Sequence, residues 1–460
     1  MAQSPAGKLS IDDLANAVSA GQIDTVLVVF PDMYGRLLGK RLTAGYFLDY
    51  VASGGTHVCD YLLACDMEMD PVPGYKFTSW EKGYGDMHAV PDVSTLRAAA
   101  WLPGCAIVLC DLFTPDHKPA GPSPRYMLQK QLQAASEMGL TAFGGTELEF
   151  YLFDESYQTA REKGYRGLKT AASYIEDYHI LQGRREDSVL GAIRRDLSAS
   201  GVTIEGTKGE WGPGQQELNL VYCDVLEQAD RAVLCRHASK EIADIQNKAI
   251  TYMAKWDETL AGSGMHLHVS LWNAEGENAF TGPTKIGSSS VSETFRQFLG
   301  GILAHTLEIT ALFAPNVSSY KRFQASSFAP TSIAWSDDNR TAGYRVVGSG
   351  RSLRIECRIP GADCNPYLAY AALMAAGLDG IKNKMEAPAP FSGDIYQAAA
   401  LPRLQTSLRD ATDAFGGSQW TRETFGSDVV DHYVHFFRTE QRKFDEIVTD
   451  WEKNRFFERI

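Results

Sequence analysis

Acidic and apolar side chains alternate in residues 146–153. Glu147 and Glu149 stand two positions apart, and Leu148 and Phe150 occupy the positions between and after them. Successive side chains of a strand point to opposite faces, so the two carboxylates share one face and the apolar side chains fill the other. Paired carboxylates of this kind are ligands for hard divalent cations.

Charged side chains line one face of other segments as well. Glu210 and Glu217 lie on either side of a turn rich in Gly and Pro, which is the geometry of a hairpin mouth. The alternation seen around Glu147 recurs in two further segments. His266 and His268 share a face in one of them, and Arg354, Glu356 and Arg358 share a face in the other.

A half-exposed antiparallel strand with its polar face toward water explains any one of these segments. A set of half-exposed strands explains less well why all these segments carry groups that bind ions. Carboxylates and imidazoles bind cations, and arginines bind carboxylates and phosphates. If the faces converge, five glutamates in one pocket cannot all stay ionised without bound cations. Oxygen-rich ligands with one histidine and no thiolate favour Mg²⁺ or Mn²⁺ over zinc.

The elements that must position these residues fall into two groups. Short strands are predicted at 25–30, 35–41 and 105–113, followed by a break rich in Pro and Gly at 114–125. We therefore predict two domains, 1–117 and 118–460, the second containing both helices and strands. Its predicted strands are 141–153, 264–272 and 353–360, and its predicted helices are 126–138, 231–250, 292–313 and 366–384.

Composition excludes several classes of partner. The net charge is −13 and no block of Lys and Arg could follow a phosphate backbone, so nucleic acid is not expected to bind. Apolar runs such as 105–110 are too short to cross a membrane, and the N-terminus has no apolar signal segment. We expect a cytoplasmic protein whose eight cysteines stay reduced and pack as small apolar groups.

Six motifs, taken in order, make the chain similar to the type I glutamine synthetase family from about Gly21 to the C-terminus. They are Glu147-x-Glu149-Phe, Gly214-Gln-x-Glu217, Gly262-Ser-Gly-Met-His266-x-His268, Pro315-Asn316-x-x-Ser319-Tyr-Lys-Arg322, Trp335-x-x-x-Asn339-Arg340, and Arg354-x-Glu356-x-Arg358-x-Pro360 followed by Asn365-Pro-Tyr-Leu.

The resemblance implies an α+β fold, with an N-terminal β-grasp domain over 1–117 and a catalytic domain of antiparallel strands backed by helices over 118–460. It also implies a homo-oligomer, a dodecamer of two stacked hexameric rings with active sites between neighbouring subunits.

The resemblance assigns roles residue by residue, with ATP and Mg²⁺ or Mn²⁺ as cofactors. One metal site corresponds to Glu149, Glu210 and Glu217, and the other to Glu147, His266 and Glu356. The nucleotide side corresponds to Glu205, His268, Ser270, Arg345 and Arg351. The glutamate side corresponds to Gly262, Arg322 and Arg358, with Arg340 facing both the substrate carboxylate and the transferred phosphate.

Two departures from the family pattern concern the amine. In members that use ammonia, the flap, a segment after Arg322 that closes the site, carries a glutamate before Ala-Pro. This chain has Phe328 at that position. The same members carry an Asn at the position where this chain has Ala261. A phenyl ring cannot hold ammonium by a charge–charge contact but can lie along the methylenes of an alkyl amine. The chain thus resembles the γ-glutamyl polyamine and γ-glutamyl ethanolamide synthetases, ATP-dependent ligases that join L-glutamate to an organic amine through γ-glutamyl phosphate.

Two alternatives stay open at this point: an authentic glutamine synthetase that uses ammonia, and a non-catalytic structural or regulatory relative. Asp60 is a candidate for the first-domain acidic residue of the amine site. Tyr396 lacks the prolines that surround the family's regulatory tyrosine, and we interpret it as an ordinary surface tyrosine.

Overall fold

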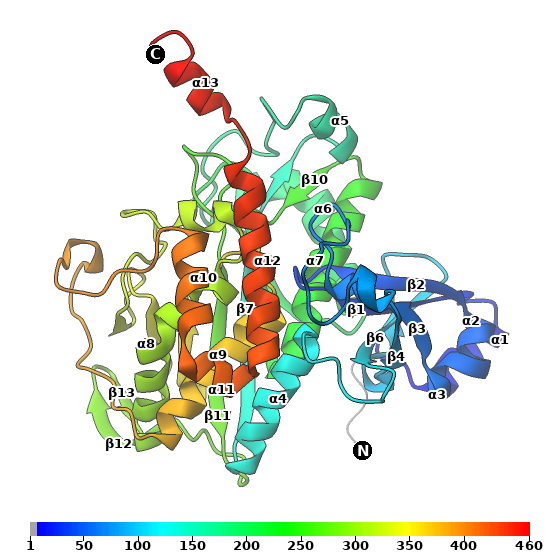
Figure 1. The fold of residues 1–460 in the computed structure, drawn as a ribbon, viewed down its shortest axis with the longest axis horizontal. Coiled ribbons are helices and arrows are strands. Elements are labelled where there is room, and N and C mark those ends of the chain that lie inside the picture. The colour runs from blue at the N-terminus through cyan, green and yellow to red at the C-terminus, as the bar shows by residue number, and fades with distance from the viewer. Residues whose placement is uncertain (1–6) are drawn as a thin grey trace.

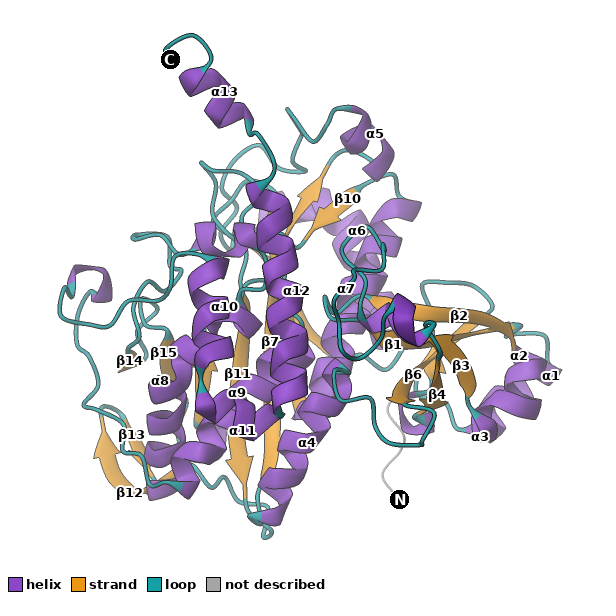
Figure 2. Cartoon of the chain, viewed as in Figure 1, coloured by secondary structure: helices purple, strands orange, loops and turns teal. Residues whose placement is uncertain are grey.

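The computed structural model describes residues 7–460 of the chain. Its strands form a six-stranded sheet near the N-terminus, an eight-stranded sheet in the rest of the chain and a separate two-stranded hairpin. The smaller sheet lies beside the larger, helix-covered part (Figure 1). Helices and strands are interspersed through this larger part (Figure 2), so the fold is mixed α and β, as predicted.

The smaller sheet has the strand order β2-β1-β6-β4-β3, with β5 beside β6. β1 and β6 run parallel and the other pairs are antiparallel. Leu14 of helix α1 packs with the sheet side chains Val26 and Phe30 in a core of their own. The elements are α1 (Ile11–Ser19), β1 (Thr25–Pro31), β2 (Leu37–Thr43), α2 (Ala44–Tyr46), α3 (Ala52–Gly54), β3 (Thr56–Cys59), β4 (Asp86–Pro91), β5 (Arg97–Ala98) and β6 (Cys105–Phe113).

The larger sheet has the order β14-β15-β16-β11-β7-β9-β8, with β10 beside β7. Its pairs are antiparallel except for β14 with β15. The strands are β7 (Thr141–Phe153), β8 (Ile204–Gly209), β9 (Gln215–Asp224), β10 (Ala249–Thr251), β11 (Met265–Trp272), β14 (Trp335–Asp337), β15 (Tyr344–Val347) and β16 (Arg354–Cys357), and the hairpin is β12 (Thr281–Ile286) with β13 (Ser289–Val291).

Helices cover the apolar face of this sheet. Leu148 and Phe150 share one core with side chains of α4, α7, α8 and α9. Helix α9 is apolar on nearly all sides and buried, as expected for a helix inside a large core. The helices are α4 (Pro124–Glu137), α5 (Tyr157–Glu162), α6 (Ile180–Ala199), α7 (Val225–Ile245), α8 (Glu293–Phe313), α9 (Pro366–Lys382), α10 (Leu408–Gly417), α11 (Gln419–Phe425), α12 (Ser427–Asp445) and α13 (Asp450–Phe456).

The predicted strands 105–113 and 141–153 agree with β6 and β7, but the predicted helix 231–250 is wrong at both ends. Helix α7 begins earlier because Asp224 caps it, accepting from the backbone N–H groups of Leu226 and Glu227. It ends at Ile245, and Asn247 then takes a left-handed φ of 55°. The chain reverses there, and Ala249–Thr251 pairs with β7 as strand β10.

A buried arginine joins the N-terminal part of the chain to the helices of the larger part. Arg125 of α4 is 1% exposed and pairs with Asp92 at 2.7 Å, with Asp111 of β6 at 2.6 Å and with Asp230 of α7 at 3.1 Å. One guanidinium therefore neutralises carboxylates from both parts of the chain. None of the helices in residues 7–460 combines the length and apolarity that crossing a lipid bilayer requires.

Arg125→Met should destabilise the protein by about 3–5 kcal/mol, because it leaves the buried Asp230 and the partly exposed Asp92 and Asp111 without their shared cation. The measurement is the free energy of unfolding by chemical denaturation. Arg438→Met is the matched control, since the Arg438–Asp413 pair has the same kind of contact at 3.0 Å but is exposed to water. Equal losses in the two variants would show that the buried pairs do not hold the parts together.

Candidate active site

The register of neighbouring strands brings the predicted charged faces together. Glu147 of β7 lies opposite His266 of β11, and Glu149 of β7 lies opposite Glu217 of β9. In the same way, His268 of β11 lies opposite Glu356 of β16. Directly opposite residues of an antiparallel pair point to the same face. The charged face is thus continuous across β16, β11, β7 and β9, and it is the face away from the helices.

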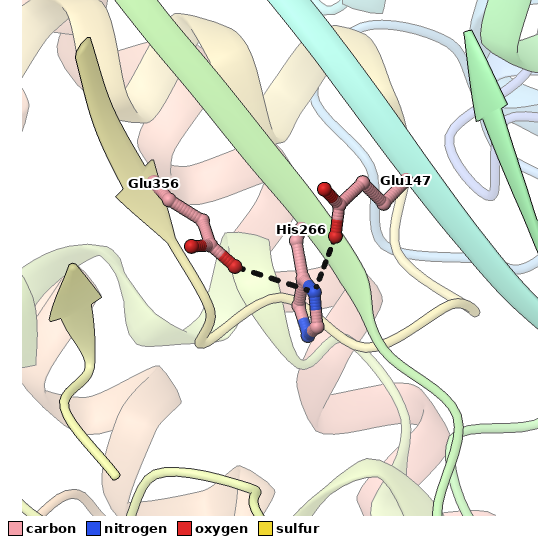
Figure 3. Close-up of side chains that lie close together, drawn as sticks. All are labelled: Glu147, His266 and Glu356. Carbon is pink, nitrogen blue, oxygen red and sulfur yellow. Dashed lines mark hydrogen bonds and ion pairs between the residues drawn. The ribbon is translucent and has the colours of Figure 1, made fainter. Parts of the chain in front are cut away.

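Glu147, His266 and Glu356 form the first cluster (Figure 3). The His266 Nδ1 atom lies 3.1 Å from Glu147 Oε2 and 3.6 Å from Glu356 Oε1. One ligand atom from each residue falls within 4.8 Å of the others, so the three could hold one metal ion. This is the trio that the sequence predicted for one metal site.

Glu149, Glu217 and His266 form the second cluster, with ligand atoms within the same 4.8 Å limit. The His266 Nε2 atom lies 3.7 Å from Glu149 Oε1, and the backbone N–H of Gly264 donates to Glu149 Oε2 at 2.7 Å. This cluster differs from the predicted trio in its third member, because His266 stands where Glu210 was expected.

Glu210 lines the same cavity, but its carboxylate turns toward a lysine. The Lys208 ammonium bonds to Glu210 and lies 3.9 Å from Glu217 Oε1. Lys208 thus pairs with Glu210 and lies near Glu217 at the hairpin mouth. Sequence reasoning missed Lys208, although it stands two residues before Glu210 on strand β8 and therefore on the same face.

Burial and neighbouring charges divide these carboxyls into two kinds. Burial, with Glu147 and Glu210 nearby, raises the pKa of Glu217 to about 9. Burial also raises the pKa of Glu149. For Glu147 the effect of burial is outweighed by hydrogen bonds from His266 and His268, and its pKa is lowered. Arg358 and His266 likewise outweigh burial at Glu356, whose pKa falls to about 2.

A cavity of about 670 Å³ is lined by Glu147, Glu149, Glu210 and Glu217 together with arginines, whereas the Glu356 side chain is fully buried. The Arg358 guanidinium donates to Glu356, and the buried Arg322 guanidinium donates to the carbonyls of Ile359 and Arg358 at 2.9 and 3.0 Å. Arg340 lines the cavity with an exposed side chain, for which residues 7–460 supply no hydrogen bond or ion pair. It is free to meet a ligand.

Gly262 lines the cavity at a point where no larger residue fits. A Cβ there would lie 2.7 Å from the Ala254 carbonyl oxygen and 2.8 Å from Arg322 Cγ. The Gly262 carbonyl accepts from the Gln215 side-chain amide at 2.9 Å. The glycine therefore brings the backbone close to Arg322 within the cavity.

A second cavity of about 490 Å³ adjoins the first and shares Glu205 and His268 with it. Ser270 and Arg351 also line the second cavity, and the Arg351 guanidinium lies over the Trp272 ring at 4.6 Å. Four of the five predicted nucleotide-side residues therefore meet here.

Arg345 is the fifth predicted nucleotide-side residue, and it lines the first cavity instead. Its strand register places it opposite Glu356, to which its guanidinium donates at 2.8 Å. Asp338 accepts from the same guanidinium at 3.0 Å. Arg345 therefore faces the carboxylate clusters in this structure.

An aromatic pair forms part of the wall of the first cavity. Phe328 is 50% exposed and holds a left-handed φ of 58°. Its ring lies edge to face with that of Trp211, with 6.3 Å between the ring centroids. Trp211 directly follows Glu210 and was not predicted, because a single tryptophan in a turn has no periodic pattern to mark it.

The arrangement fits two-cation phosphoryl chemistry. Carboxylate oxygens and one imidazole are suitable ligands for hard or borderline divalent cations. A carboxyl with a raised pKa lacks nearby positive charge to stabilise its ionised form, and a bound cation would supply that charge. Arginines around the same cavity can hold carboxylate and phosphate oxygens. The second cavity offers aromatic and cationic side chains next to the clusters.

Comparisons with known proteins find relatives along nearly the whole chain. The glutamine synthetase catalytic-domain family matches residues 122–456. The chain is 44% identical to the γ-glutamylethanolamide synthetase GlnA4 of Streptomyces coelicolor, over 98% of this chain and 96% of that protein. It is 34% identical to glutamate–isopropylamine ligase of a Pseudomonas species, over 98% and 99% of the two chains. A solved structure of a GmaS/ADP complex is similar with a TM-score of 0.84 and 27% identity, over 97% and 99% of the two chains.

Mg²⁺ should stabilise the chelator-treated protein more at about pH 8 than at about pH 6. The pKa of Glu217 in the folded state is about 9 and its ordinary value is 4.5, so its contribution to stability is present at low pH and is lost as the pH rises between these values. A cation that binds the ionised carboxylate offsets this loss.

The measurement is the increase in Tm on adding Mg²⁺ at each pH. In Glu217→Gln the increase should be smaller and should grow less with pH, because an amide neither titrates nor carries charge and only Glu149 of this cluster is left with a raised pKa. An equal increase at both pH values in the parent protein would show that Glu217 does not meet the cation.

Proposed function

The chain belongs to the glutamine synthetase family, and we propose from its site that it activates glutamate with ATP and transfers the γ-glutamyl group to an organic amine. It is an ATP-dependent carbon–nitrogen ligase, and its product is a γ-glutamyl amide. Phosphate transfer from ATP to the γ-carboxylate gives γ-glutamyl phosphate, and the amine then displaces phosphate. ATP is required because a free carboxylate is a poor acyl donor, whose leaving group would be an oxide.

We propose that Glu149, Glu210 and Glu217 hold one divalent cation and Glu147, His266 and Glu356 hold the other. The clustering of ligand atoms around His266 supports the second site, and the raised pKa of Glu217 supports the first. Lys208 would release Glu210 when a cation arrives, because both neutralise the same charge. Bound Mg²⁺ or Mn²⁺ would neutralise phosphate oxygens during the transfer.

The arginines would bind the remaining negative groups of the reactants. We assign Arg322 and Arg358, with the backbone of Gly262, to the glutamate side, and Arg340 to the substrate carboxylate and the phosphate in transfer. Their common position around one cavity supports this assignment. We place the nucleotide in the second cavity, with Glu205, His268, Ser270 and Arg351 around it and Arg345 beside the phosphates.

One observation supports an organic amine rather than ammonia as the acceptor. Phe328 and Trp211 give this part of the cavity an apolar wall, and Phe328 takes the flap position where ammonia-using relatives carry a glutamate. Such a wall can bury methylenes but offers ammonium at most a cation–π contact. Both relatives described above take organic amines by their names, ethanolamine in one and isopropylamine in the other.

The two alternatives fit the site less well. An ammonia-using enzyme would need another carboxylate to act in place of the flap glutamate, and Asp177 is a cavity residue that could be tested for this role. A non-catalytic relative would have no need for so many like charges in one pocket, since their burial opposes folding.

We also propose a domain division and an oligomeric state for the protein. The N-terminal sheet would be a β-grasp domain within 1–117, with the catalytic domain at 118–460, and the chain would assemble as a dodecamer of two stacked hexamers. Asp60, which accepts from the Thr78 hydroxyl at 2.5 Å, would then reach the amine site of a neighbouring subunit. All eight cysteines are unpaired, which suits the cytoplasm.

Arg340→Lys should lower turnover by orders of magnitude. Lysine keeps the charge but loses the planar fork that spans two oxygens. Steady-state amide formation measures the effect, with Arg438→Lys as a control at an exposed arginine away from the cavity. A loss of less than about tenfold, roughly 1.4 kcal/mol, would place Arg340 outside the reacting centre.

Ammonium should be a poorer substrate than ethanolamine or a simple alkylamine at equal concentration. Each buried methylene contributes about 0.8 kcal/mol, so two favour the larger amine by roughly tenfold. Phe328→Glu should narrow this preference, whereas Phe328→Leu should keep it because the wall stays apolar.

The ratio of kcat/KM for ammonium and for the best amine, taken from a panel that includes ethanolamine, putrescine and spermidine, measures the preference. If the parent enzyme already prefers ammonium, it is a glutamine synthetase with an unusual flap.

A further inference from the structure

We propose that Tyr396 is a positioning residue that holds the loop 323–330 in place at the cavity, so that the amine rather than water reaches the activated glutamate. The inference rests on the proposed function. It concerns a hydroxyl group outside the reacting centre, which acts through the loop that carries Phe328.

The contact between Tyr396 and the loop is a single hydrogen bond. The Tyr396 hydroxyl donates to the Ala329 carbonyl oxygen at 2.9 Å. Ser327, Phe328 and Ala329 all line the cavity, so this bond ends at the cavity wall. Burial raises the pKa of Tyr396, and the hydroxyl therefore keeps the proton that it donates.

The other hydrogen bonds of this loop are local. Ser327 Oγ donates to the Gln324 carbonyl at 2.6 Å and accepts weakly from the Ala329 N–H at 3.4 Å. Within residues 7–460, the bond from Tyr396 is the one hydrogen bond that reaches the loop from a distant part of the sequence. The loop thus depends on Tyr396 for its polar attachment to the body of the protein.

The backbone of the loop needs such an attachment. Ser326 and Phe328 have φ values of 61° and 58°, in the left-handed region that residues with side chains seldom occupy. Strained backbone of this kind persists only where surrounding structure holds it. The Tyr396 bond, next to the second strained residue, supplies part of that hold.

Tyr396 itself stands on a firmly anchored segment. Ile395 is fully buried, and its N–H donates to the Thr341 hydroxyl at 3.3 Å. The Asn339 side chain donates to the Gly393 carbonyl at 2.8 Å. These two anchors flank Arg340 in the sequence, so Tyr396 links the loop to the segment that carries Arg340.

This placement corrects the interpretation of Tyr396 as an ordinary surface tyrosine. Its ring is half-buried and its hydroxyl is engaged with the loop. The sequence could not reveal this contact, because residues 329 and 396 are far apart and neither stands in a periodic pattern.

If the loop is loosened, water should hydrolyse part of the γ-glutamyl phosphate. Water that enters in place of the amine attacks the carbonyl carbon of γ-glutamyl phosphate, and the bond from that carbon to the phosphate oxygen breaks. Glutamate and phosphate are released, the attacking water gives up its proton to solvent, and the ATP is consumed without amide formation. The ratio of phosphate released to amide formed therefore reports how well the loop excludes water.

Tyr396→Phe removes the hydroxyl and keeps the ring. A typical hydrogen bond corresponds to about fivefold in an equilibrium between held and released loop. We expect the KM for the amine to rise by about that factor, with a higher ratio of phosphate to amide and little change in the KM for glutamate.

Tyr157→Phe is the matched control, because its hydroxyl also donates to a backbone carbonyl, that of Ile250, at 2.9 Å in a half-buried position away from the described cavities. It should leave the ratio unchanged. If Tyr396→Phe folds with the parent's Tm and keeps the parent's ratio and amine KM, Tyr396 does not position the loop. Failure of the parent enzyme to form amide with any amine would instead overturn the proposed function.

Discussion

The repulsion among carboxylates that share one cavity is the constraint to which the rest of the structure responds. Glutamates from β7, β9 and β16 meet on one face of the sheet, with histidines of β11 among them. Left in water, these groups would separate, and only a rigid sheet with a well-packed core behind it can hold them together. The apolar residues that alternate with the carboxylates supply that core. The same strands therefore bring the carboxylates together on one face and stabilise the arrangement through the other face.

The site divides into a rigid part and a more adaptable part. The two histidines and the carboxylates of Glu147, Glu149, Glu217 and Glu356 stand on central strands of the larger sheet, where hydrogen bonds on both sides fix their positions. The aromatic wall stands on loops and turns, and part of it is held in strained backbone. Phosphate chemistry needs fixed geometry, whereas the choice of acceptor depends on shape and apolar surface. Under the proposed roles, each task would fall to the kind of element suited to it.

The sequence predicted best what depends on local periodicity. The alternation around Glu147 identified β7 and its charged face, and the turn rich in Gly and Pro identified the hairpin between β8 and β9. It predicted less well what depends on register between strands distant in sequence, such as the contact of Arg345 with Glu356. Lys208 was missed although its spacing of two from Glu210 indicated a shared face, and Trp211 was missed because a single tryptophan in a turn has no periodic pattern. The position of Phe328 was identified only through the family resemblance.

The placement of His266 between the two clusters would make the two proposed cation positions chemically unequal. Its Nδ1 faces Glu147 and Glu356, and its Nε2 faces Glu149. A neutral imidazole has one lone pair for a metal and carries its proton on the other nitrogen, so His266 would serve as a ligand in one of the proposed sites only. The other position is left with oxygen donors alone. Nitrogen and oxygen donors rank metals differently, so a solution containing two kinds of divalent ion would not fill the two positions alike.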